Sequence, residues 1–472
     1  MWNRVYNNRN VVYALLLAFI LAPLFFKDIE TTQFHGDESW WTHCGAEYFN
    51  LFFLERDFDN NKWHSYMGMD QPQIGRYFIG ISLWGTGGIP LLEKAYEQPI
   101  YNFAESKQWN KDHGTVTPME ILLPVRLMMA AFGLCGCLLI YYIGSRAFSP
   151  EVGFLSGLLL GFNPLLLLYS RRAMTDAPLF FFMTAVVALL PALLHCYRWN
   201  RRAALYGICC LVGILSGVAA GVKLNGGLIG LIFASWMVLL AWEVFLDGTG
   251  HGVKRNHPQN VDQNAASNTD ELLRKTCSAY SNKGDKTGQL FNILVMALLA
   301  GTTAVSTFYI ASPNMYGAPI SGALKMLDHR MRVVSDQQDN SSGRAIRTFP
   351  EKIKQTYTRL FNPSSNYSAV KFPKKIPVEL FFFTIGCIGL CISEYQYVRD
   401  NRHFSFRAYV GLWVLLLFSG IITWIPLDWG RYYLPMFPAQ VIMVAFGVTT
   451  SCSWLCHVIG RSNSAITDCS AG

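Results

Sequence analysis

Two adjacent carboxylates stand near the start of the chain, within Thr32-Gln-Phe-His-Gly-Asp-Glu-Ser-Trp-Trp41. Asp37 and Glu38 follow His35 and precede two tryptophans, and the stretch comes shortly after a long apolar run. A carboxylate held in such a place can take the proton of a hydroxyl group as a general base. The alternative is a solvated turn with an interfacial aromatic anchor, because tryptophan is enriched where a membrane meets water.

A third carboxylate lies further along, in Tyr169-Ser-Arg-Arg-Ala-Met-Thr-Asp-Ala-Pro-Leu179. This residue, Asp176, stands in a short connection between two strongly apolar stretches. Placing a charge at the middle of a bilayer costs on the order of 3 kcal/mol, so Asp176 must lie at the membrane surface or be paired. We expect it to share a site with Asp37, and an ion pair with Arg171 or Arg172 is the structural alternative.

More charged residues fall at the ends of apolar stretches on the same side of the chain. They are Asp70, Arg76, Arg126, Lys223, Asp428 and Arg431, the last followed by Tyr432. Each has a simple explanation as a helix end or an interfacial residue. Taken together, they predict a rim of carboxylates and cations around one cavity.

Such a rim suits group transfer from a phosphorylated donor. A carboxylate can accept the proton of an acceptor hydroxyl, and cations can stabilise the negative charge that develops on a departing phosphate. A site at a membrane face indicates a lipid phosphate, whose tail remains in the bilayer while its head reaches the rim.

The composition identifies the scaffold as a membrane protein. Only 15% of the 472 residues are charged and 51% are hydrophobic, whereas about 25% are charged in ordinary soluble domains. Apolar runs such as 11–26 and 228–240 contain no charge, and one crossing of a bilayer needs about 20 apolar residues. The net charge of +8 then indicates basic cytoplasmic loops rather than a nucleic-acid partner.

The hydropathy pattern predicts an all-α protein with 10–11 membrane-spanning helices. We expect them near residues 11–27, 120–147, 152–170, 177–196, 203–221, 225–245, 291–311, 378–395, 408–426 and 432–450. Short basic loops favour a cytoplasmic N-terminus, which places two large loops, 28–119 and 312–377, on the outer face. We expect short amphipathic helices in these loops, a flexible cytoplasmic linker at 246–290, one transmembrane domain over 1–450 and a short tail at 451–472.

With its motifs in this order, the chain resembles a known family between about residues 30 and 440. The shared features are an Asp-Glu pair in the first outer loop, an Arg early in the second span, Ser-Arg-x-x-x-x-Asp, a Lys in a Gly-rich turn and a late Arg-Tyr-x-Leu-Pro. They are similar to those of the protein O-mannosyltransferase and aminoarabinose-transferase group, lipid-carrier-dependent glycosyltransferases with the C-type membrane (GT-C) fold. The resemblance therefore implies a GT-C fold.

The resemblance also implies roles for individual residues. Asp37 matches the catalytic aspartate and Glu38 its partner, with Arg126 placed to hold Glu38. Asp176 matches the second acidic motif, and Lys223 matches the lysine that approaches the donor phosphate. The remaining expected phosphate ligands are Arg171, Arg172 and Arg431, and the expected supporting residues are His35, Asp70, Arg76, Asp428 and Tyr432.

The function that follows is an inverting glycosyltransferase, mannosyltransferase-like, using a polyprenyl-phosphate monosaccharide. Asp37 would act as the base, and Asp176 would orient the acceptor or Asp37. The sequence does not decide whether the acceptor hydroxyl belongs to a lipid, a glycan or a protein. The 312–377 loop is too short for the β-trefoil of eukaryotic members, which puts a protein acceptor in doubt and favours a plasma (inner) membrane with the site on its periplasmic or extracellular face. The alternative function is a transporter or flippase of a lipid-linked or anionic solute.

Two further points stay open at this level. Carboxylates and His35 could hold a divalent metal, but His-Gly-Asp-Glu has no diagnostic ligand spacing, so no cofactor is assigned. Segment 328–360 is basic and would contact lipid headgroups or an anionic acceptor, or else form a solvated, mobile lid.

Overall fold

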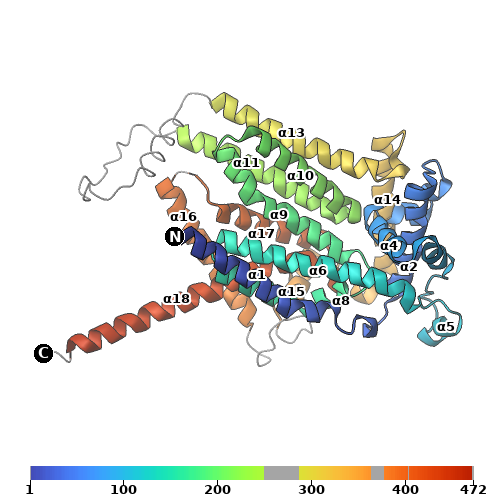
Figure 1. Ribbon diagram of the computed structural model, residues 1–472, viewed down its shortest axis with the longest axis horizontal. Coiled ribbons are helices and arrows are strands. Elements are labelled where there is room, and N and C mark those ends of the chain that lie inside the picture. The colour runs from blue at the N-terminus through green and yellow to red at the C-terminus, as the bar shows by residue number, and fades with distance from the viewer. Residues whose placement is uncertain (1, 249–285, 363–376, 402, 470–472) are drawn as a thin grey trace.

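The structure, a computed structural model, describes residues 2–248, 286–362, 377–401 and 403–469. These residues form helices joined by short connections, and the one isolated β-bridge found among them pairs Ala345 with Leu427. The helices form an elongated bundle whose two large loops gather at one end (Figure 1). We call that end, which carries residues 28–118 and 311–362, the outer end.

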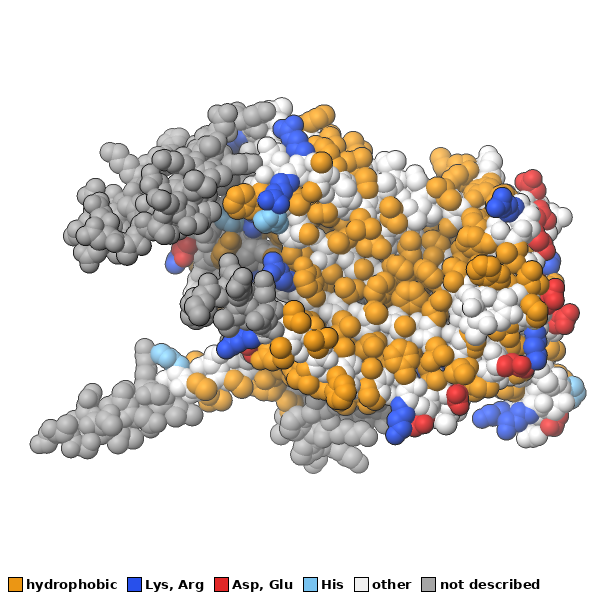
Figure 2. Space-filling view, in the orientation of Figure 1, with side chains coloured by type: hydrophobic (Ala, Val, Ile, Leu, Met, Phe, Trp, Pro, Cys, Tyr) orange, Lys and Arg blue, Asp and Glu red, His pale blue; other side chains and the backbone are white. Residues whose placement is uncertain are grey.

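Nine helices of the described ranges are long and apolar enough to cross a membrane. They belong to α1 (Trp2–Phe26), α6 (Met119–Ala147), α9 (Asp176–Arg198), α10 (Arg202–Val222), α11 (Leu228–Gly248), α13 (Lys286–Ile310), α16 (Val378–Asn401), α17 (Phe406–Trp424) and α18 (Phe437–Cys469). Apolar side chains cover the middle of the molecule and charged ones gather toward its ends (Figure 2). The predicted all-α, multi-pass membrane fold is confirmed.

The stretch expected as one upright span at 152–170 is instead a bent pair. α7 (Pro150–Gly161) and α8 (Pro164–Ser170) meet at an angle of 66°. Asn163 lies between the two helices and caps α8, because its side-chain oxygen accepts hydrogen bonds from the backbone N–H groups of Leu165 and Leu166. Pro164 lacks the N–H that a continuous helix would need. This bend carries the chain toward Asp176.

The outer loops contain helices of very different lengths, from five residues in α3 to 24 in α4. The first contains α2 (Gly36–Phe49), α3 (Tyr66–Asp70), α4 (Ile74–Glu97) and α5 (Lys107–Asp112), and the second contains α14 (Pro319–Asn340) and α15 (Phe349–Leu360). α4 packs against α2 and α6, and α14 packs against α3. The two loops therefore meet above the spans.

Two predicted segments, the linker at 246–290 and the tail at 451–472, differ from the described structure in their limits. Residues 249–285 of the predicted cytoplasmic linker lie outside the described residues. The predicted tail at 451–472 begins inside α18, which continues as a helix to Cys469. The domain limits stay a prediction.

Glycines allow several spans to approach closely. A Cβ on Gly447 of α18 would lie 1.9 Å from the carbonyl oxygen of Phe382, and one on Gly386 of α16 would lie 2.0 Å from that of Met443. Small residues let helix backbones approach in membranes, where packing replaces the hydrophobic effect as the main source of association.

We expect Gly447→Ala to lower the midpoint of thermal unfolding in detergent, because the added methyl group forces α16 and α18 apart. Overpacking of this kind costs about 1–3 kcal/mol. Gly301→Ala in α13 is the matched control, since a Cβ there meets no atom within 4 Å and alanine favours a helix. Equal midpoints for the two variants would contradict the close packing of α16 and α18.

Candidate active site

The His-Gly-Asp-Glu sequence begins helix α2. The His35 ring nitrogen Nδ1 accepts a hydrogen bond from the backbone N–H of Asp37, and a Glu38 carboxylate oxygen accepts one from the backbone N–H of His35, at 2.9 Å. This is a capping box, which satisfies N–H groups that the first helical turn leaves without partners. The motif therefore directs Asp37 and Glu38 to different sides of the turn.

Glu38 lies in the protein interior, fully buried beside an equally buried Arg126. The guanidinium of Arg126 donates to both carboxylate oxygens at 2.9 Å, and the backbone N–H of Ala173 donates a further bond at 2.8 Å. Arg126 also donates to the carbonyl oxygens of Ile29 and Thr32. The pair joins α2, α6 and the 171–175 connection, so Glu38 holds the site together from behind and does not face the cavity.

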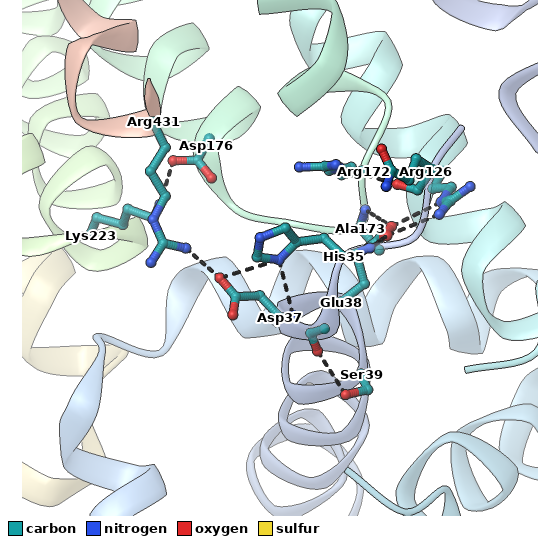
Figure 3. Close-up of polar contacts among 12 residues, drawn as sticks. His35, Asp37, Glu38, Ser39, Arg126, Arg172, Ala173, Asp176, Lys223 and Arg431 are labelled. Atoms are coloured by element: carbon teal, nitrogen blue, oxygen red, sulfur yellow. Dashed lines mark hydrogen bonds and ion pairs between the residues drawn. The ribbon is translucent and has the colours of Figure 1, made fainter. Parts of the chain in front are cut away.

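Asp37 points the other way, toward Arg431, which donates a hydrogen bond to its carboxylate (Figure 3). Burial raises the pKa of Asp37, but the charge and hydrogen bond of Arg431, together with the electrostatic effects of His35 and Lys223, outweigh burial, so the pKa lies below its ordinary value of 3.8. Asp37 is therefore a carboxylate at neutral pH. Burial lowers the pKa of His35, which keeps the ring neutral, as its role as a hydrogen-bond acceptor requires.

Asp176 is the first residue of α9 and pairs with Lys223, whose ammonium lies 2.5 Å from one carboxylate oxygen. The second oxygen of Asp176 is buried without a partner in the described structure. Lys223 occupies the break between α10 and the short turn Leu224–Gly227. Gly226 permits this break, because a Cβ there would lie 2.1 Å from the carbonyl oxygen of Ala219.

A third ion pair joins the two outer loops. Arg330 of α14 donates to the carboxylate of Asp70, at the end of α3, over 3.0 Å. The sequence indicated Asp70 as a supporting residue, whereas Arg330 was one of several cations in a basic segment. Only the packing of α14 on α3 singles it out.

All three pairs line one cavity of about 330 Å³, which we call the membrane-side cavity. Its wall comprises Asp37, Asp70, Asp176, Lys223, Arg330 and Arg431, the aromatic residues Trp40, Trp41, Tyr66, Phe103, Trp424 and Tyr432, and Gln71, Leu179, Leu224, Asn225, Val333 and Gln337. The volume lies in the range of small-molecule sites. Of the charged residues expected at the rim, Asp37, Asp70, Asp176, Lys223 and Arg431 line this space, whereas Arg76, Arg126 and Asp428 do not.

The membrane-side cavity borders an apolar groove between α11 and α17. A groove of about 290 Å³ contains Leu228, Leu416, Gly420 and Thr423. Trp424 of the cavity wall directly follows Thr423, and Leu224 of the wall lies four residues, about one helical turn, before Leu228. Ser235 lines this groove and also the next hollow, of about 450 Å³, which reaches Trp242 and Phe404. An apolar path therefore follows the two spans away from the ion pairs.

A second space of about 820 Å³, the loop-side cavity, lies beyond Asp37. Residues 340–344 and 428–431 form much of its wall, together with His35, Tyr169 and Arg359. Asp37, Phe103, Gln337 and Arg431 line both cavities. Asp37 therefore stands at the junction of an ion-pair-rich space next to the spans and a polar space among the loops.

Three cations of the expected site lie elsewhere. Arg76 is fully buried and donates to the side chain of Gln73 and the carbonyl oxygen of Met67. Arg171 donates to the carbonyl oxygen of Lys27 at 2.7 Å. Arg172 lies beside the Tyr169 ring and donates to the carbonyl oxygen of Gln33 at 3.4 Å. None of the three lines either cavity, so the expected phosphate contacts of Arg171 and Arg172 and the expected place of Arg76 at the rim are corrected.

The last motif divides between the two cavities. Asp428 accepts two hydrogen bonds from Arg359, at 2.8 and 2.7 Å, in the loop-side cavity. Tyr432 lines the membrane-side cavity, and its buried hydroxyl has no hydrogen-bond partner in the described structure. Arg359 and Gln337 were not expected, because neither stands in a recognisable motif.

A metal site is not evident in this arrangement. No cluster of three or more His, Cys, Asp and Glu side chains suited to a metal ion occurs in the described ranges. Each cavity carboxylate near His35 or Lys223 is already neutralised by a cation, so we derive no step through a metal.

Comparison with known proteins connects this geometry to a family. Residues 41–257, a little under half of the chain, match the family described as dolichyl-phosphate-mannose-protein mannosyltransferase. The archaeal oligosaccharyltransferase AglB from Archaeoglobus fulgidus, solved with an inhibitory peptide and a dolichol-phosphate, superimposes with a TM-score of 0.51 at 13% identity, over 98% of this chain and 52% of that one. This chain has the GT-C fold. The resemblance drawn from the motifs is confirmed.

Two other structures are similar at lower TM-scores. ArnT from Cupriavidus metallidurans bound to undecaprenyl phosphate gives 0.47 at 14% identity, over 96% of this chain and 63% of that one. The S. cerevisiae protein O-mannosyltransferase Pmt1-Pmt2 complex bound to the sugar donor gives a TM-score of 0.40 at 16% identity, over 64% of this chain and 33% of that one. The GT-C chain thus spans less than two thirds of the length of these structures, and no protein of curated function matches it in sequence.

We expect Glu38→Gln to destabilise the GT-C chain by about 3 kcal/mol, because it leaves the Arg126 charge buried without a counter-ion. The measurement is thermal or denaturant unfolding in detergent. Glu120→Gln is the matched control, since Glu120 pairs with Lys94 at an exposed site and such pairs contribute about 0–1 kcal/mol. Equal stability of the two variants would show that the buried pair does not hold α2 in place.

Proposed function

We propose that the chain is an inverting glycosyltransferase that moves a monosaccharide from a polyprenyl-phosphate donor to an acceptor hydroxyl. One observation carries the proposal: three ion pairs line a cavity that borders an apolar groove between two spans. A donor with a charged head and a long apolar tail fits both parts at once. The family match and the GT-C fold support the same reaction.

The donor phosphate would lie near Lys223 and Arg431, with Arg330 as a third cation. Each is now paired with a carboxylate, so the cavity is close to neutral and its cations are not all free for the ligand. An arginine has five N–H donors, which lets Arg431 contact a phosphate oxygen while it still bonds Asp37. The polyprenyl tail would follow the groove between α11 and α17.

In the reaction, the acceptor oxygen bonds to the anomeric carbon from the side opposite the phosphate. The bond from that carbon to the phosphate oxygen breaks, and its electron pair leaves with the lipid phosphate. Asp37 takes the hydroxyl proton, while Lys223 and Arg431 stabilise the charge on the leaving group. The junction of the two cavities at Asp37 supports this order, with the donor in the membrane-side cavity and the acceptor in the loop-side cavity.

Asp176 takes a different role in this proposal from the one the motif implies. Its carboxylate contacts Lys223 and not Asp37. We therefore assign Asp176 to positioning the Lys223 ammonium. Burial disfavours the charged form of a lysine, and a neighbouring carboxylate offsets that effect. Glu38 and Arg126 position the turn that carries Asp37.

The proposal also includes the membrane that holds the protein and the side of that membrane on which the site lies. The outer end would face away from the cytoplasm, as the short basic loops favour. The 312–377 loop, too short for a β-trefoil, favours the periplasm or the cell exterior of a plasma (inner) membrane. A transporter would place ionisable residues near the middle of its spans, whereas the ion pairs here belong to helix ends and connections.

We expect Asp37→Asn to lower donor turnover by at least about 100-fold, because amide nitrogen and oxygen cannot accept the proton. The assay follows the release of free lipid phosphate from a panel of polyprenyl-phosphate sugars in nanodiscs. Donor binding, measured on the same samples, should persist. Glu120→Gln should turn over at the wild-type rate, and an Asp37→Asn variant as fast as this control would overturn the assignment.

We expect Arg431→Gln to move the acid limb of the turnover profile to higher pH. The change removes both the Arg431 charge and its hydrogen bond, which oppose the effect of burial on Asp37, so the pKa of Asp37 rises relative to the wild type. A base with a raised pKa becomes protonated earlier as the pH falls, so activity is lost at a higher pH than in the wild type. Arg332→Gln, an exposed change on α14, should leave the profile in place, and superimposable profiles for Arg431→Gln and the wild type would contradict the coupling.

A further inference from the structure

Two uncharged residues at the junction of the cavities have no role in the proposed reaction so far. Asp37, Phe103, Gln337 and Arg431 line both cavities, and the two charged members pair with each other. In the proposed reaction the anomeric carbon passes from a phosphate in the membrane-side cavity to an oxygen in the loop-side cavity. The sugar must therefore lie where the cavities meet, beside Phe103 and Gln337.

Phe103 is held next to Asp37 by contacts within the first outer loop. The hydroxyl oxygen of Ser39, on α2, accepts a hydrogen bond from the backbone N–H of Tyr101 at 2.8 Å. The Phe103 ring lies against the start of α2, where a Cβ on Gly36 would be 2.7 Å from it. The ring is nevertheless 64% exposed. A fixed, open aromatic ring is a platform for the C–H groups of a sugar, because its face carries partial negative charge.

Gln337 reaches the junction from the second outer loop. It shares one side of α14 with Arg330 and Val333, which line the membrane-side cavity, because residues three and four apart are neighbours on a helix. The side-chain oxygen of Gln337 is buried and has no hydrogen-bond partner in the described part of the chain. A buried polar atom without a partner lowers stability, and a sugar hydroxyl in the adjoining cavity can donate to this one.

The end of α14 is fixed to the connection that follows α17. The side chain of Gln338 donates to the carbonyl oxygen of Pro426 at 2.9 Å. The backbone N–H of Asp428 donates to the carbonyl oxygen of Arg344 at 2.8 Å. The backbone that carries Gln337 is therefore held in one place, as selection between similar ligands requires.

Given the proposed function, on which this inference rests, we propose that Phe103 and Gln337 select the sugar that is transferred. The Phe103 ring covers one face of the sugar, and the Gln337 side chain bonds one of its hydroxyl groups. Both residues are uncharged and therefore suit a neutral sugar that carries hydroxyl groups. A site built to bond a hydroxyl rejects the analogue that lacks it, because the polar group of the site is then left without a partner.

The test uses the full chain in nanodiscs and measures the dissociation constant of each donor together with the release of lipid phosphate. A panel of polyprenyl-phosphate sugars first identifies the sugar that binds most tightly. Deoxy forms of that donor, each lacking one hydroxyl group, are then compared with the parent. We expect the wild type to bind one deoxy donor about 10-fold more weakly than the parent, since a buried polar atom loses its partner.

In Gln337→Leu the parent donor should bind only as well as that deoxy donor, while the ratios for the other hydroxyl groups stay as in the wild type. The unfolding midpoint of this variant should not fall, because the change removes a buried atom that has no partner. Gln355→Leu is the matched control, since Gln355 is a half-buried glutamine of α15 that lines neither cavity.

For the ring, Phe103→Leu should weaken binding of the parent donor several-fold, and Phe103→Tyr should preserve it. Phe349→Leu is the control, because that ring is 56% exposed on α15 and lines neither cavity. It should bind the donor as the wild type does.

The outcomes separate this selection from the transfer itself. Unchanged ratios among the deoxy donors in Gln337→Leu would overturn the role of Gln337, and equal binding by Phe103→Leu and Phe103→Tyr would overturn that of Phe103. Release of lipid phosphate by the wild type would leave the proposed function standing in both cases. The expected ratios without any release would instead mean that the two residues select a bound lipid-linked sugar and that the transferase function is wrong. If no donor binds, both fail.

Discussion

Glu38 and Arg126 form a fully buried ion pair in which each carboxylate oxygen accepts two hydrogen bonds. Charges are costly in a low-dielectric interior unless every donor and acceptor is satisfied, so this pair tolerates one geometry only. Its bonds reach the start of α2, the second span and the connection before Asp176. The place of Asp37 follows, because the same capping turn that buries Glu38 directs its neighbour outward.

Opposite charges also pair in the wall of the membrane-side cavity, where the side chains are more exposed than Glu38 and Arg126. Three cations and three carboxylates come from different parts of the chain: the first outer loop, the span ends and α14. Such pairing lets a site hold several cations at a membrane surface without a large net charge. Unpaired cations would repel one another when no anion is bound. A phosphate then competes with carboxylates for donors that are already oriented.

The two cavities and the groove give the site a direction. Apolar walls lead from the ion pairs along α11 and α17, and polar loop residues lead from Asp37 to the other side. Because Asp37 lines both cavities, it is suited to chemistry between a membrane-bound substrate and one that enters from water.

Much of this protein could be derived from residue types and spacing. Long uncharged runs predict the spans because a bilayer leaves no other place for them, and the Asp-Glu motif, Asp176 and Lys223 stand out as charges at span ends. The side each neighbour faces was decided by the tertiary structure. As neighbouring acidic residues, Asp37 and Glu38 were distinguished only by the family resemblance, and it is packing against Arg126 that buries Glu38. Likewise Arg171, Arg172 and Arg76 resemble Arg431 in sequence, but their partners are carbonyl groups and rings away from the cavity. Arg330 joins the site because α14 crosses the spans, a contact between segments 260 residues apart that no local pattern encodes.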